Sequence, residues 1–445
     1  MKYAAYSEYK TSPMTWLDQL PTHWNAASLR WMSKRYAGGT PDKGNEAYWE
    51  EGEIPWINSG AVNDGYITQP SELITREGFA KSSAKWIPKD ALVMALAGQG
   101  KTKGMVAQLG IPTTCNQSMA ALIPDHRFAP RYLYYWLTAN YQNIRNLAGG
   151  EARDGLNLEM LGSIPCPVPP VDEQQTIARF LDAKATQIDA LVAQKRQLID
   201  KLKEKRSALI ARTVTRGLPP EATNAAGLEP NPEMKDSGVS WLGTIPDHWD
   251  IDKFSREVHI TEGQVDPEVE PFASMFLIAP NHIESGSGRL LALETAAEQF
   301  AESGKYLCPE GAVVYSKIRP ALRKVVIAPE NCLCSADMYP LTCRNKLTNP
   351  YLYWLLLSNQ FSAWSVLESD RVAMPKINRE TLNELRIPIP PQEEQLEIVE
   401  YLAMETAKVD HLLSKADAVI SSLTEYRQAL ITSSVTGKID VRALA

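Results

Sequence analysis

The chain has 445 residues and a formal net charge of −7, with 44% apolar and 22% charged residues, as expected of a folded protein of two or three domains. No run of about 18 apolar residues is present and Met1–Glu8 lacks the apolar core of a signal peptide, so we expect a cytoplasmic protein without a membrane span. The six cysteines form no CxxC pair and have no histidine at zinc spacing, which predicts reduced, mostly buried thiols and no metal site. The acidic charge argues mildly against nucleic acid, although local patches decide binding.

A tryptophan–histidine motif occurs twice, as W-L-D-Q-L-P-T-H-W at Trp16–Trp24 and as W-L-G-T-I-P-D-H-W at Trp241–Trp249. Each histidine, His23 or His248, sits between a turn-forming proline and a tryptophan. We therefore interpret both as structural residues of a turn that enters a strand, with the tryptophan in the core, rather than as catalytic groups.

Short strand-like segments follow each copy of this motif. They alternate with turns rich in glycine, asparagine and proline, and they include 54–57 and 91–95 in the first half and 274–279, 312–315 and 324–328 in the second. Strands of this length and spacing predict a mixed or antiparallel sheet in each half.

An aromatic segment closes each half, at Pro130–Leu137 and at Asn349–Leu356. A proline at the first turn after a polar residue that can cap predicts a helix start. Aromatic and aliphatic residues cover every face, which favours a core helix over a stacking platform for bases. Asn349-Pro350-Tyr351 resembles an amino-methyltransferase motif, but the second proline is missing and no glycine-rich cofactor loop precedes it.

Ala95–Thr102, A-L-A-G-Q-G-K-T, nearly spells a phosphate-binding loop. Such a loop needs a helix next, because the helix N-terminus holds the phosphates. The sequence that follows, 103–110, is short, bounded by glycines and strand-like. We therefore predict a positively charged hairpin loop, and nucleotide binding is the weaker alternative. No Ser/His/Asp set or paired carboxylates at a defined spacing point to catalysis.

The phrase P-P-x-x-E-Q begins two long helical segments. Pro170, Glu173 and Gln174 recur 221 positions later as Pro391, Glu394 and Gln395. Each copy leads into about forty residues with apolar side chains at steps of four and three, which predicts a coiled coil. Counted in this way, the predicted seam positions are Ile177, Leu181, Lys184, Ile188, Leu191, Lys195, Leu198, Leu202, Lys205 and Leu209, and then Ile398, Leu402, Glu405, Val409, Leu412, Ala416, Val419, Leu423, Tyr426 and Leu430.

Two helices of about 60 Å that follow equivalent domains can cover their apolar stripes by facing each other. Because each helix follows an equivalent domain, a pseudo-two-fold axis relates the two helices, and we expect them to be antiparallel. Between the first helix and the second half, Gly217–Pro232 is rich in proline and small polar residues, so it is predicted to be a linker without a packed element.

Corresponding loops in the two halves are basic. Lysine and arginine neutralise phosphates, while asparagine, glutamine and arginine can read base edges. The candidate DNA-binding residues are Lys101, Thr102, Lys103, Asn116 and Gln117 in the first half, and Lys317, Arg319, Arg323 and Lys324 in the second. Within 195–216, eight basic and two acidic residues give a net charge of +6, which suits either a solvated helix face or contact with DNA or a partner.

Taken together, the motifs resemble the specificity subunit of type I restriction–modification enzymes. The resemblance rests on the repeated I-P-x-P-x-P-P-x-x-E-Q phrase, found at Ile164–Gln174 and in shortened form at Ile387–Gln395, on Met234–Trp249, which is similar to the usual start of a second recognition domain, and on Val214–Leu218, similar to the usual helix exit. It covers essentially the whole chain and departs mainly within 31–90 and 255–310.

This resemblance implies an α+β protein with two tandem, pseudo-symmetric target-recognition domains of mixed β structure and short helices, separated by a pair of long antiparallel coiled-coil helices. The expected boundaries are a first target-recognition domain at 1–170, a central spacer helix at 171–216, a linker at 217–239, a second target-recognition domain at 240–391, and a C-terminal spacer helix and tail at 392–445.

The resemblance further implies a non-catalytic subunit that binds double-stranded DNA at a bipartite site. Two methyltransferase (modification) subunits and the restriction/translocase subunits are the expected partners, and S-adenosylmethionine, ATP and Mg are expected on those partners and not on this chain. The candidate residues for partner contact and the spacer helices are Glu173, Gln174, Ile188, Leu198, Leu202, Glu394, Gln395, Val409 and Leu423. The acidic net charge and the apolar seams support an alternative, a structural adaptor that joins protein partners without binding DNA.

Overall fold

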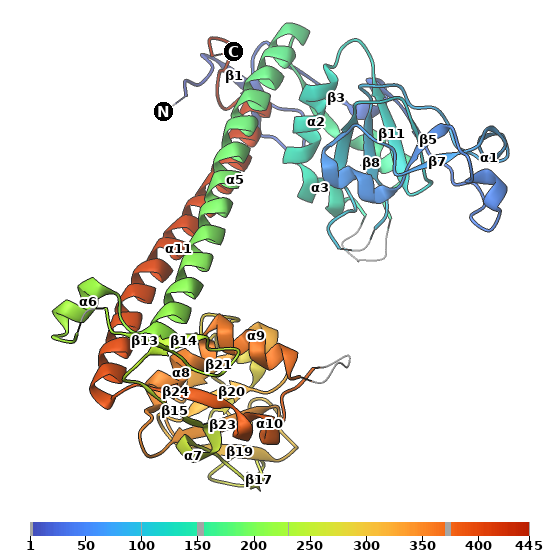
Figure 1. Ribbon diagram of the computed structural model, residues 1–445. Helices are drawn as coiled ribbons and strands as arrows, with labels where there is room; N and C mark the ends of the chain where they lie inside the picture. The colour runs from blue at the N-terminus through green and yellow to red at the C-terminus, as the bar shows by residue number, and fades with distance from the viewer. Residues whose placement is uncertain (1–2, 99, 149–154, 230, 370–374, 445) are drawn as a thin grey trace. The chain divides into compact units, whose positions relative to one another are not determined.

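The computed structural model describes residues 3–98, 100–148, 155–229, 231–369 and 375–444. The chain divides into two compact units (Figure 1). Unit 1 comprises residues 1–194 and 418–445, and unit 2 comprises 195–417. Each unit therefore contains part of both long helices, α5 (Val171–Arg216) and α11 (Gln392–Val435).

Unit 1 is built on a five-stranded sheet in the order β4-β11-β8-β9-β6 and a three-stranded sheet in the order β10-β5-β7. All pairings are antiparallel except β10 with β5 and β6 with β9, which are parallel. Two further antiparallel pairs are β1 with β2 and β12 with β3. The strands are β1 (Tyr9–Thr11), β2 (Gln19–Pro21), β3 (Asn25–Ser28), β4 (Ser33–Ala37), β5 (Ile54–Ile57), β6 (Tyr66–Ile67), β7 (Glu72–Ile74), β8 (Leu92–Ala95), β9 (Val106–Leu109), β10 (Thr114–Cys115), β11 (Met119–Pro124) and β12 (Pro165–Val168).

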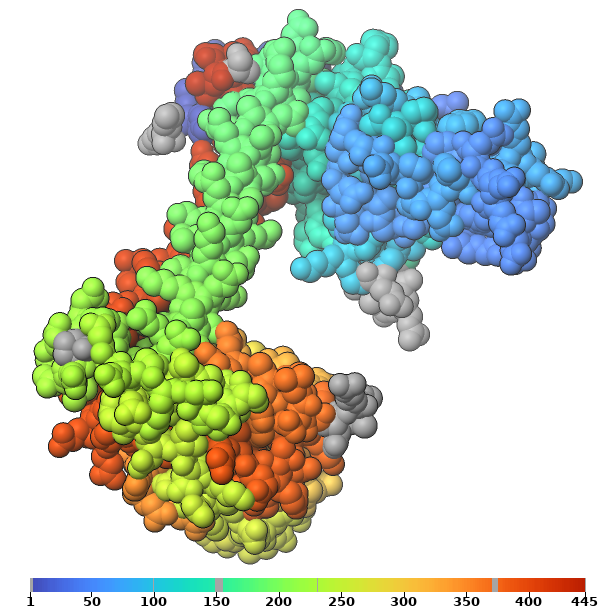
Figure 2. Space-filling model, in the orientation of Figure 1, coloured from blue at the N-terminus to red at the C-terminus, as the bar shows by residue number. Residues whose placement is uncertain are grey.

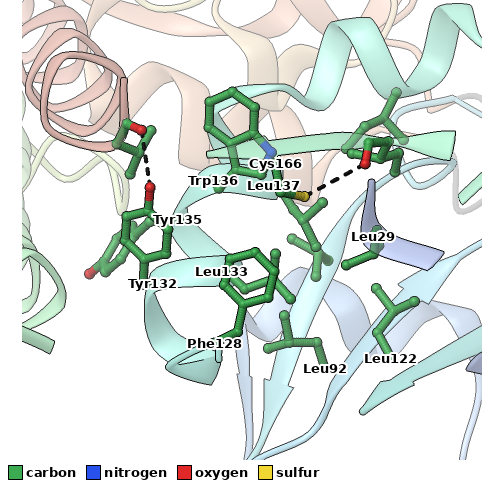
Figure 3. Packing of buried hydrophobic residues seen from close by; sticks show 14 of the residues in the cluster. Leu29, Leu92, Leu122, Phe128, Tyr132, Leu133, Tyr135, Trp136, Leu137 and Cys166 are labelled. Carbon is green, nitrogen blue, oxygen red and sulfur yellow. Dashed lines mark hydrogen bonds between the residues drawn. The ribbon is translucent and has the colours of Figure 1, made fainter. Parts of the chain in front are cut away.

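Short helices cover these sheets. They are α1 (Arg76–Ala80), α2 (Pro130–Ala139), α3 (Tyr141–Asn146) and α4 (Leu158–Ser163), with 3-10 turns η1 (Leu29–Trp31), η2 (Glu46–Tyr48) and η3 (Ser59–Asp64). The buried residues of α2 belong to one cluster with the sheet residues Leu92 and Leu122, and Leu133 of this helix faces the sheet (Figure 3). Tyr132, Tyr135 and Trp136 are fully enclosed, which confirms that this helix belongs to the core.

Unit 2 repeats this arrangement with two four-stranded sheets, ordered β16-β23-β20-β21 and β17-β19-β22-β18, and with the pairs β13–β14 and β15–β24. Among the described strands of this unit, only β18 and β22 pair in parallel. The strands are β13 (Met234–Asp236), β14 (Thr244–Pro246), β15 (Asp250–Lys253), β16 (Val258–Ile260), β17 (Gln264–Val265), β18 (Leu277–Ile278), β19 (Lys305–Cys308), β20 (Val313–Ser316), β21 (Val325–Ile327), β22 (Cys332–Cys334), β23 (Met338–Cys343) and β24 (Arg386–Ile389). The helices are α6 (Pro220–Ala225), α7 (Phe254–Glu257), α8 (Asn349–Leu357), α9 (Asn359–Leu367) and α10 (Arg379–Glu384), with η4 (Pro280–His282) and η5 (Pro320–Leu322).

The prediction that the linker holds no packed element is wrong. Helix α6 forms within it, and Leu218 and Leu228 pack against the core of unit 2. Pro220 suits the first helical turn because its missing N–H would have no partner there. The Thr223 hydroxyl donates to the Leu218 and Pro219 carbonyls at 3.2 and 2.9 Å. Tertiary burial thus orders a segment whose composition favours coil.

Helices α5 and α11 pack together. They run antiparallel, because the contact nearer the start of α5 is made by a residue nearer the end of α11. In unit 2, Arg206 Nε lies 2.9 Å from Asp410 Oδ1. In unit 1, Arg427 Nε lies 3.3 Å from Asp189 Oδ1. Both members of the second pair stand 221 positions from their counterparts in the first, the spacing of the sequence repeat.

The predicted seam is wrong over part of each helix. Leu191, Leu198, Leu412, Val419 and Tyr426 are 41–50% exposed, while Ile199, one residue beyond Leu198, is 8% exposed. On α5 a step of four from 188 to 192 replaces the predicted step of three, and the more enclosed positions that follow are 195, 199, 202 and 206. Alternate predicted positions (191, 198 and 205) therefore move by one residue, while 195 and 202 stay. On α11 the same step from 409 to 413 is followed by 416, 420, 423 and 427, so 416, 423 and 430 stay. A straight helix drifts relative to a strict heptad, so such a shift restores the buried face.

The fold class is confirmed, with two mixed β domains joined by long helices that pack together. All six cysteines lie in the described part of the chain and are free thiols, five of them buried, as predicted. Among the described residues, no helix is long and apolar enough to span a membrane.

Candidate nucleic-acid interface and helix joints

Each long helix is joined to its domain by the glutamate of its first turn. In unit 1 the Glu173 carboxylate accepts hydrogen bonds from Trp24 Nε1 at 3.1 Å and from the Tyr6 hydroxyl at 2.6 Å, and His23 Nε2 lies 2.9 Å away. A carboxylate here also suits the positive end of the helix dipole. The tryptophan–histidine motif and the P-P-x-x-E-Q phrase therefore meet in space.

Unit 2 repeats this joint. Glu394 accepts from Trp249 Nε1 at 2.9 Å, and His248 Nε2 lies 2.7 Å from the same oxygen. Both tryptophans are fully enclosed. The two histidines thus act in the structural role expected of them. Removing the carboxylate would leave a buried indole N–H unsatisfied, at a typical cost of about 1–3 kcal/mol.

The neighbouring glutamine completes each joint. Gln174 accepts from the Ala129 N–H and donates to the Arg127 and Pro169 carbonyls, each at 2.8 Å. The amide of Gln395 bonds in the same way to Thr348, Lys346 and Pro390, at 2.8–2.9 Å. The polar cap expected at the start of the aromatic helices is not formed, because Ala129 precedes α2 and the Thr348 side chain makes no capping hydrogen bond. The four glutamate and glutamine residues are buried, so a partner would touch only the residues around them.

The other end of each helix enters the opposite domain. The Tyr132 hydroxyl donates to the Val435 carbonyl of α11 at 3.3 Å, and the Tyr351 hydroxyl donates to the Val214 carbonyl of α5 at 2.9 Å. Val435 belongs to the core of unit 1 and Val214 to the core of unit 2. In unit 1 the Asp440 N–H donates to the Ala4 carbonyl at 2.8 Å, which holds the N-terminal segment beside the segment that follows α11 (Figure 1).

The basic loop of unit 1 connects β8 and β9, an antiparallel hairpin, so the segment that resembles a phosphate-binding loop leads into a strand and not a helix. Gln99 of that segment lies outside the described residues. Helix α3 holds the loop: Arg145 Nη1 donates to the Gly100 carbonyl at 2.8 Å, and the Tyr141 hydroxyl donates to the Lys101 carbonyl. Lys101 is exposed, Thr102 is half-buried and Lys103 is only 5% exposed.

The second candidate pair of unit 1 lies in the turn between β10 and β11, beside this loop. The Leu96 N–H donates to the Ser118 carbonyl at 2.8 Å, which links the loop to the turn. Asn116 is half-buried, and its Oδ1 has no hydrogen-bond partner among the described residues. Gln117 is exposed and accepts from the Thr40 hydroxyl. The structure thus brings all five candidates of unit 1 to one end of the sheet, where Ala95 of β8 pairs with Met119 of β11.

The equivalent loop of unit 2 connects β20 and β21, which also form an antiparallel hairpin. The Lys317 N–H donates to the Asp337 carbonyl at 3.0 Å, so this loop also lies beside a turn, Ser335–Asp337. Arg319 is exposed, and Lys317 Nζ is 5.3 Å from the centroid of the Tyr339 ring.

The other two cations of this loop are directed into the chain. Lys324 Nζ donates to the Pro280 carbonyl, and Arg323 Nη1 donates to Ser207 Oγ of α5 at 3.1 Å and to Asn359 Oδ1. Burial and the nearby Arg206 lower the pKa of Arg323.

Sequence reasoning missed the residues that hold these loops, Tyr141 and Arg145 in unit 1 and Arg206 and Ser207 in unit 2. The one available signal was the 221-residue spacing of the two aspartate–arginine pairs. Among the described residues, no group of three or more histidine, cysteine or carboxylate side chains could hold a metal ion.

Comparison with known proteins identifies the family of the chain. The family model described as "Type I restriction modification DNA specificity domain" matches residues 24–203 and 277–410. The specificity subunit of the type I restriction enzyme EcoDI from Escherichia coli is 29% identical over 313 residues, which cover 69% of this chain and 70% of that protein.

Two solved structures share the fold. A chain from a structure titled as the basis of complex assembly and conformational transition of the type I R-M system has a TM-score of 0.68 at 17% identity, with 94% of this chain and 99% of that chain covered. The HsdS subunit of Thermoanaerobacter tengcongensis has a TM-score of 0.52 at 15% identity, with 94% and 98% covered.

The repeated domains with equivalent basic loops, joined by paired helices, define a two-domain DNA-recognition protein. The chain belongs to the family of type I restriction–modification specificity subunits. It is the non-catalytic specificity subunit of a type I complex, the component that recognises the DNA target site.

Proposed function

We propose that the two domains read the two halves of a bipartite DNA site and that α5 and α11 set the spacing between the halves. The observation that carries this proposal is the equivalence of the β8–β9 and β20–β21 loops. Each loop presents a cation, Lys101 or Arg319, beside a polar turn, but the residues in the two loops and turns differ. Equivalent position with different chemistry favours two half-sites of different sequence.

Within this proposal the candidate DNA contacts divide by exposure. Lys101, Gln117 and Arg319 are exposed, and Thr102, Asn116 and Lys317 are half-buried. A cation that neutralises a phosphate adds affinity, whereas an amide or guanidinium group facing a base edge adds specificity. Lys103, Arg323 and Lys324 are more enclosed or are bonded within the chain, so we assign them to shaping the loops.

In the complex, two methyltransferase subunits would bind this chain and supply the S-adenosylmethionine chemistry, and restriction subunits would supply ATP- and Mg-dependent cleavage in the cytoplasm. The exposed apolar side chains of the long helices support a protein partner there. Leu191 and Leu198 on α5, and Leu412, Val419 and Tyr426 on α11, recur at seven-residue spacing next to the seam. Part of the outer face of α5 is uncovered (Figure 2). One such stripe on each helix suits two copies of one partner.

Leu198→Glu combined with Val419→Glu is expected to reduce by at least about tenfold the modification subunit that co-purifies with this chain, because each change places a charge in an apolar contact. Gln197→Glu with Ser421→Glu is the matched control, since it adds the same charge at exposed neighbouring positions. Equal recovery of the partner from both double variants would show that the stripes are not the contact.

The central test is methylation-sensitive sequencing of DNA from cells that express this chain with its modification subunits. We expect one bipartite N6-methyladenine motif that disappears when this chain is omitted. The motif gives both half-sites and the spacer together. A continuous motif, or methylation that persists without this chain, would refute the two-domain mechanism.

A further inference from the structure

The β20–β21 loop of unit 2 is hydrogen-bonded to the long helix α5. Arg323, at the end of this loop, donates from Nη1 to Ser207 Oγ at 3.1 Å, and its carbonyl accepts from the Gly286 N–H at 3.4 Å. Helix α9 supports the other side of the loop, where the Ser362 hydroxyl donates to the Pro320 carbonyl at 3.4 Å. The loop that carries Lys317 and Arg319 is thus held from three directions.

Arg206 extends this connection to α11. Its side chain is 9% exposed, and its Nε pairs with Asp410 of α11 at 2.9 Å. Its Nη1 and Nη2 donate to the Gly286 and Ser287 carbonyls at 3.2 and 3.1 Å. A single guanidinium therefore joins both helices to the turn that contacts Arg323.

The loop has a constrained backbone. Arg319 and Arg323, on either side of η5, both have φ of 48°, in the left-handed region that non-glycine residues rarely adopt. Such conformations persist where the surroundings determine them, and they concentrate at binding sites. Here hydrogen bonds to residues of α5 and α9 hold the loop in this conformation.

The contact between loop and helix is polar. A cavity of about 470 Å³ lies beneath it, lined by Lys203, Arg206, Ser207, Arg323, Asp410 and other residues. The hydrogen bonds of Arg206 and Arg323 connect the loop and the neighbouring turn to α5 beside this cavity. Removing them should loosen the loop without opening the core of unit 2.

Unit 1 is arranged differently. Its loop is held by Tyr141 and Arg145 of α3, within the domain itself. Arg427, the repeat counterpart of Arg206, pairs with Asp189 and, in the part of the chain that the structure describes, makes no hydrogen bond to a domain loop. Within the residues that the structure describes, the long helices are therefore hydrogen-bonded to the β20–β21 loop and not to the β8–β9 loop.

We propose that Arg206 and Arg323 are positioning residues that couple α5 to the recognition loop of the second domain. Reading of the half-site bound by that domain depends on this coupling, and reading of the other half-site does not. The inference rests on the proposed two-half-site function. It also reassigns Arg323 from a DNA contact to an internal support of Arg319 and Lys317.

The test uses the assembled complex with Arg323→Gly, Ser207→Ala and Arg206→Met. Glycine suits the positive φ at position 323, so Arg323→Gly removes the guanidinium without adding backbone strain. Arg427→Met is the matched control, because it removes the counterpart of Arg206. Binding is measured on the target and on DNA with one base pair changed in either half-site, over a range of salt concentrations.

We expect Arg323→Gly and Arg206→Met to lower discrimination at the second domain's half-site by about tenfold, within the effect of one base-pair mismatch, and Ser207→Ala to lower it less. Discrimination at the other half-site, and the slope of affinity against salt, should stay at the wild-type values. Arg427→Met should leave discrimination at both half-sites unchanged.

Three results would overturn the inference. The first is wild-type discrimination in both arginine variants. The second is an equal loss at both half-sites. The third is a reduction by about one in the magnitude of the slope of log affinity against log salt in Arg323→Gly, which would make Arg323 a phosphate contact. A wild-type complex without any sequence-specific binding would instead overturn the proposed function, and the inference with it.

Discussion

Replacing Lys101, Lys317 and Arg319 together by glutamate is expected to weaken target binding by the assembled complex by at least roughly a hundredfold. The slope of log affinity against log salt is negative, and each cation that leaves a phosphate reduces its magnitude by about 0.9, so the loss of three contacts would reduce the magnitude by about 3. Binding is measured by fluorescence anisotropy at several salt concentrations. Lys103 is left unchanged because its side chain is buried, and a reversed charge there would disturb the fold.

A control with the same change in net charge separates local contact from long-range repulsion. Lys10, Lys89 and Lys438 are exposed, and Lys89 precedes β8 whereas the candidate loop follows it. Their replacement by glutamate should lower affinity only slightly. If the first triple variant binds as tightly as the second at moderate salt, the loops do not contact DNA and recognition must use another surface.

Inserting one heptad into each long helix is expected to lengthen the spacer of the recognised site by about three base pairs and to leave both half-sites unchanged. Seven residues add about 10.5 Å of helix, and each base pair spans about 3.4 Å. Insertions after Gln194 and Lys415 preserve both aspartate–arginine pairs, because these pairs lie on either side of the two positions. Methylation-sensitive sequencing reports the new motif.

Five-residue insertions at the same two positions are the control. They turn the following seam by about 140°, which takes apolar positions out of the helix contact, so loss of specific methylation is expected. A heptad variant whose half-sites change while the spacer stays fixed would contradict the role of the helices in setting the spacing.

The start of each long helix could be predicted from sequence because its causes are local. A proline pair, acidic residues in the first turn and an uninterrupted helical rhythm lie within a few residues of Glu173 and Glu394. The contact of Glu173 with the tryptophan–histidine motif could not be predicted, since about 150 residues separate Glu173 from Trp24 in the sequence. The repeat suggested only that the two features belong to one unit.

The candidate site was less predictable. Lys101 and Lys103 are two positions apart in one loop, yet one is exposed and the other is enclosed. Arg323 and Arg319 have the same backbone conformation, but Ser207, more than a hundred residues earlier, holds the first. The direction of a long basic side chain depends on such distant partners. The predicted seam position of Leu198 was wrong for another reason. A straight helix has about 3.6 residues per turn and a heptad repeat has 3.5, so the buried face moves by one residue after several turns.

The entry of each helix end into the opposite domain also determines when each core can close during synthesis. All residues of unit 2 lie between 195 and 417, so it can complete its core as soon as that segment has left the ribosome. Unit 1 must wait for Leu430, Ile431 and Val435, although most of its strands are made first. At 5–20 residues per second the delay after residue 194 is on the order of ten seconds or more. The usual order, in which the N-terminal domain folds first, is thus reversed, and the apolar surface of the first domain is exposed for longest.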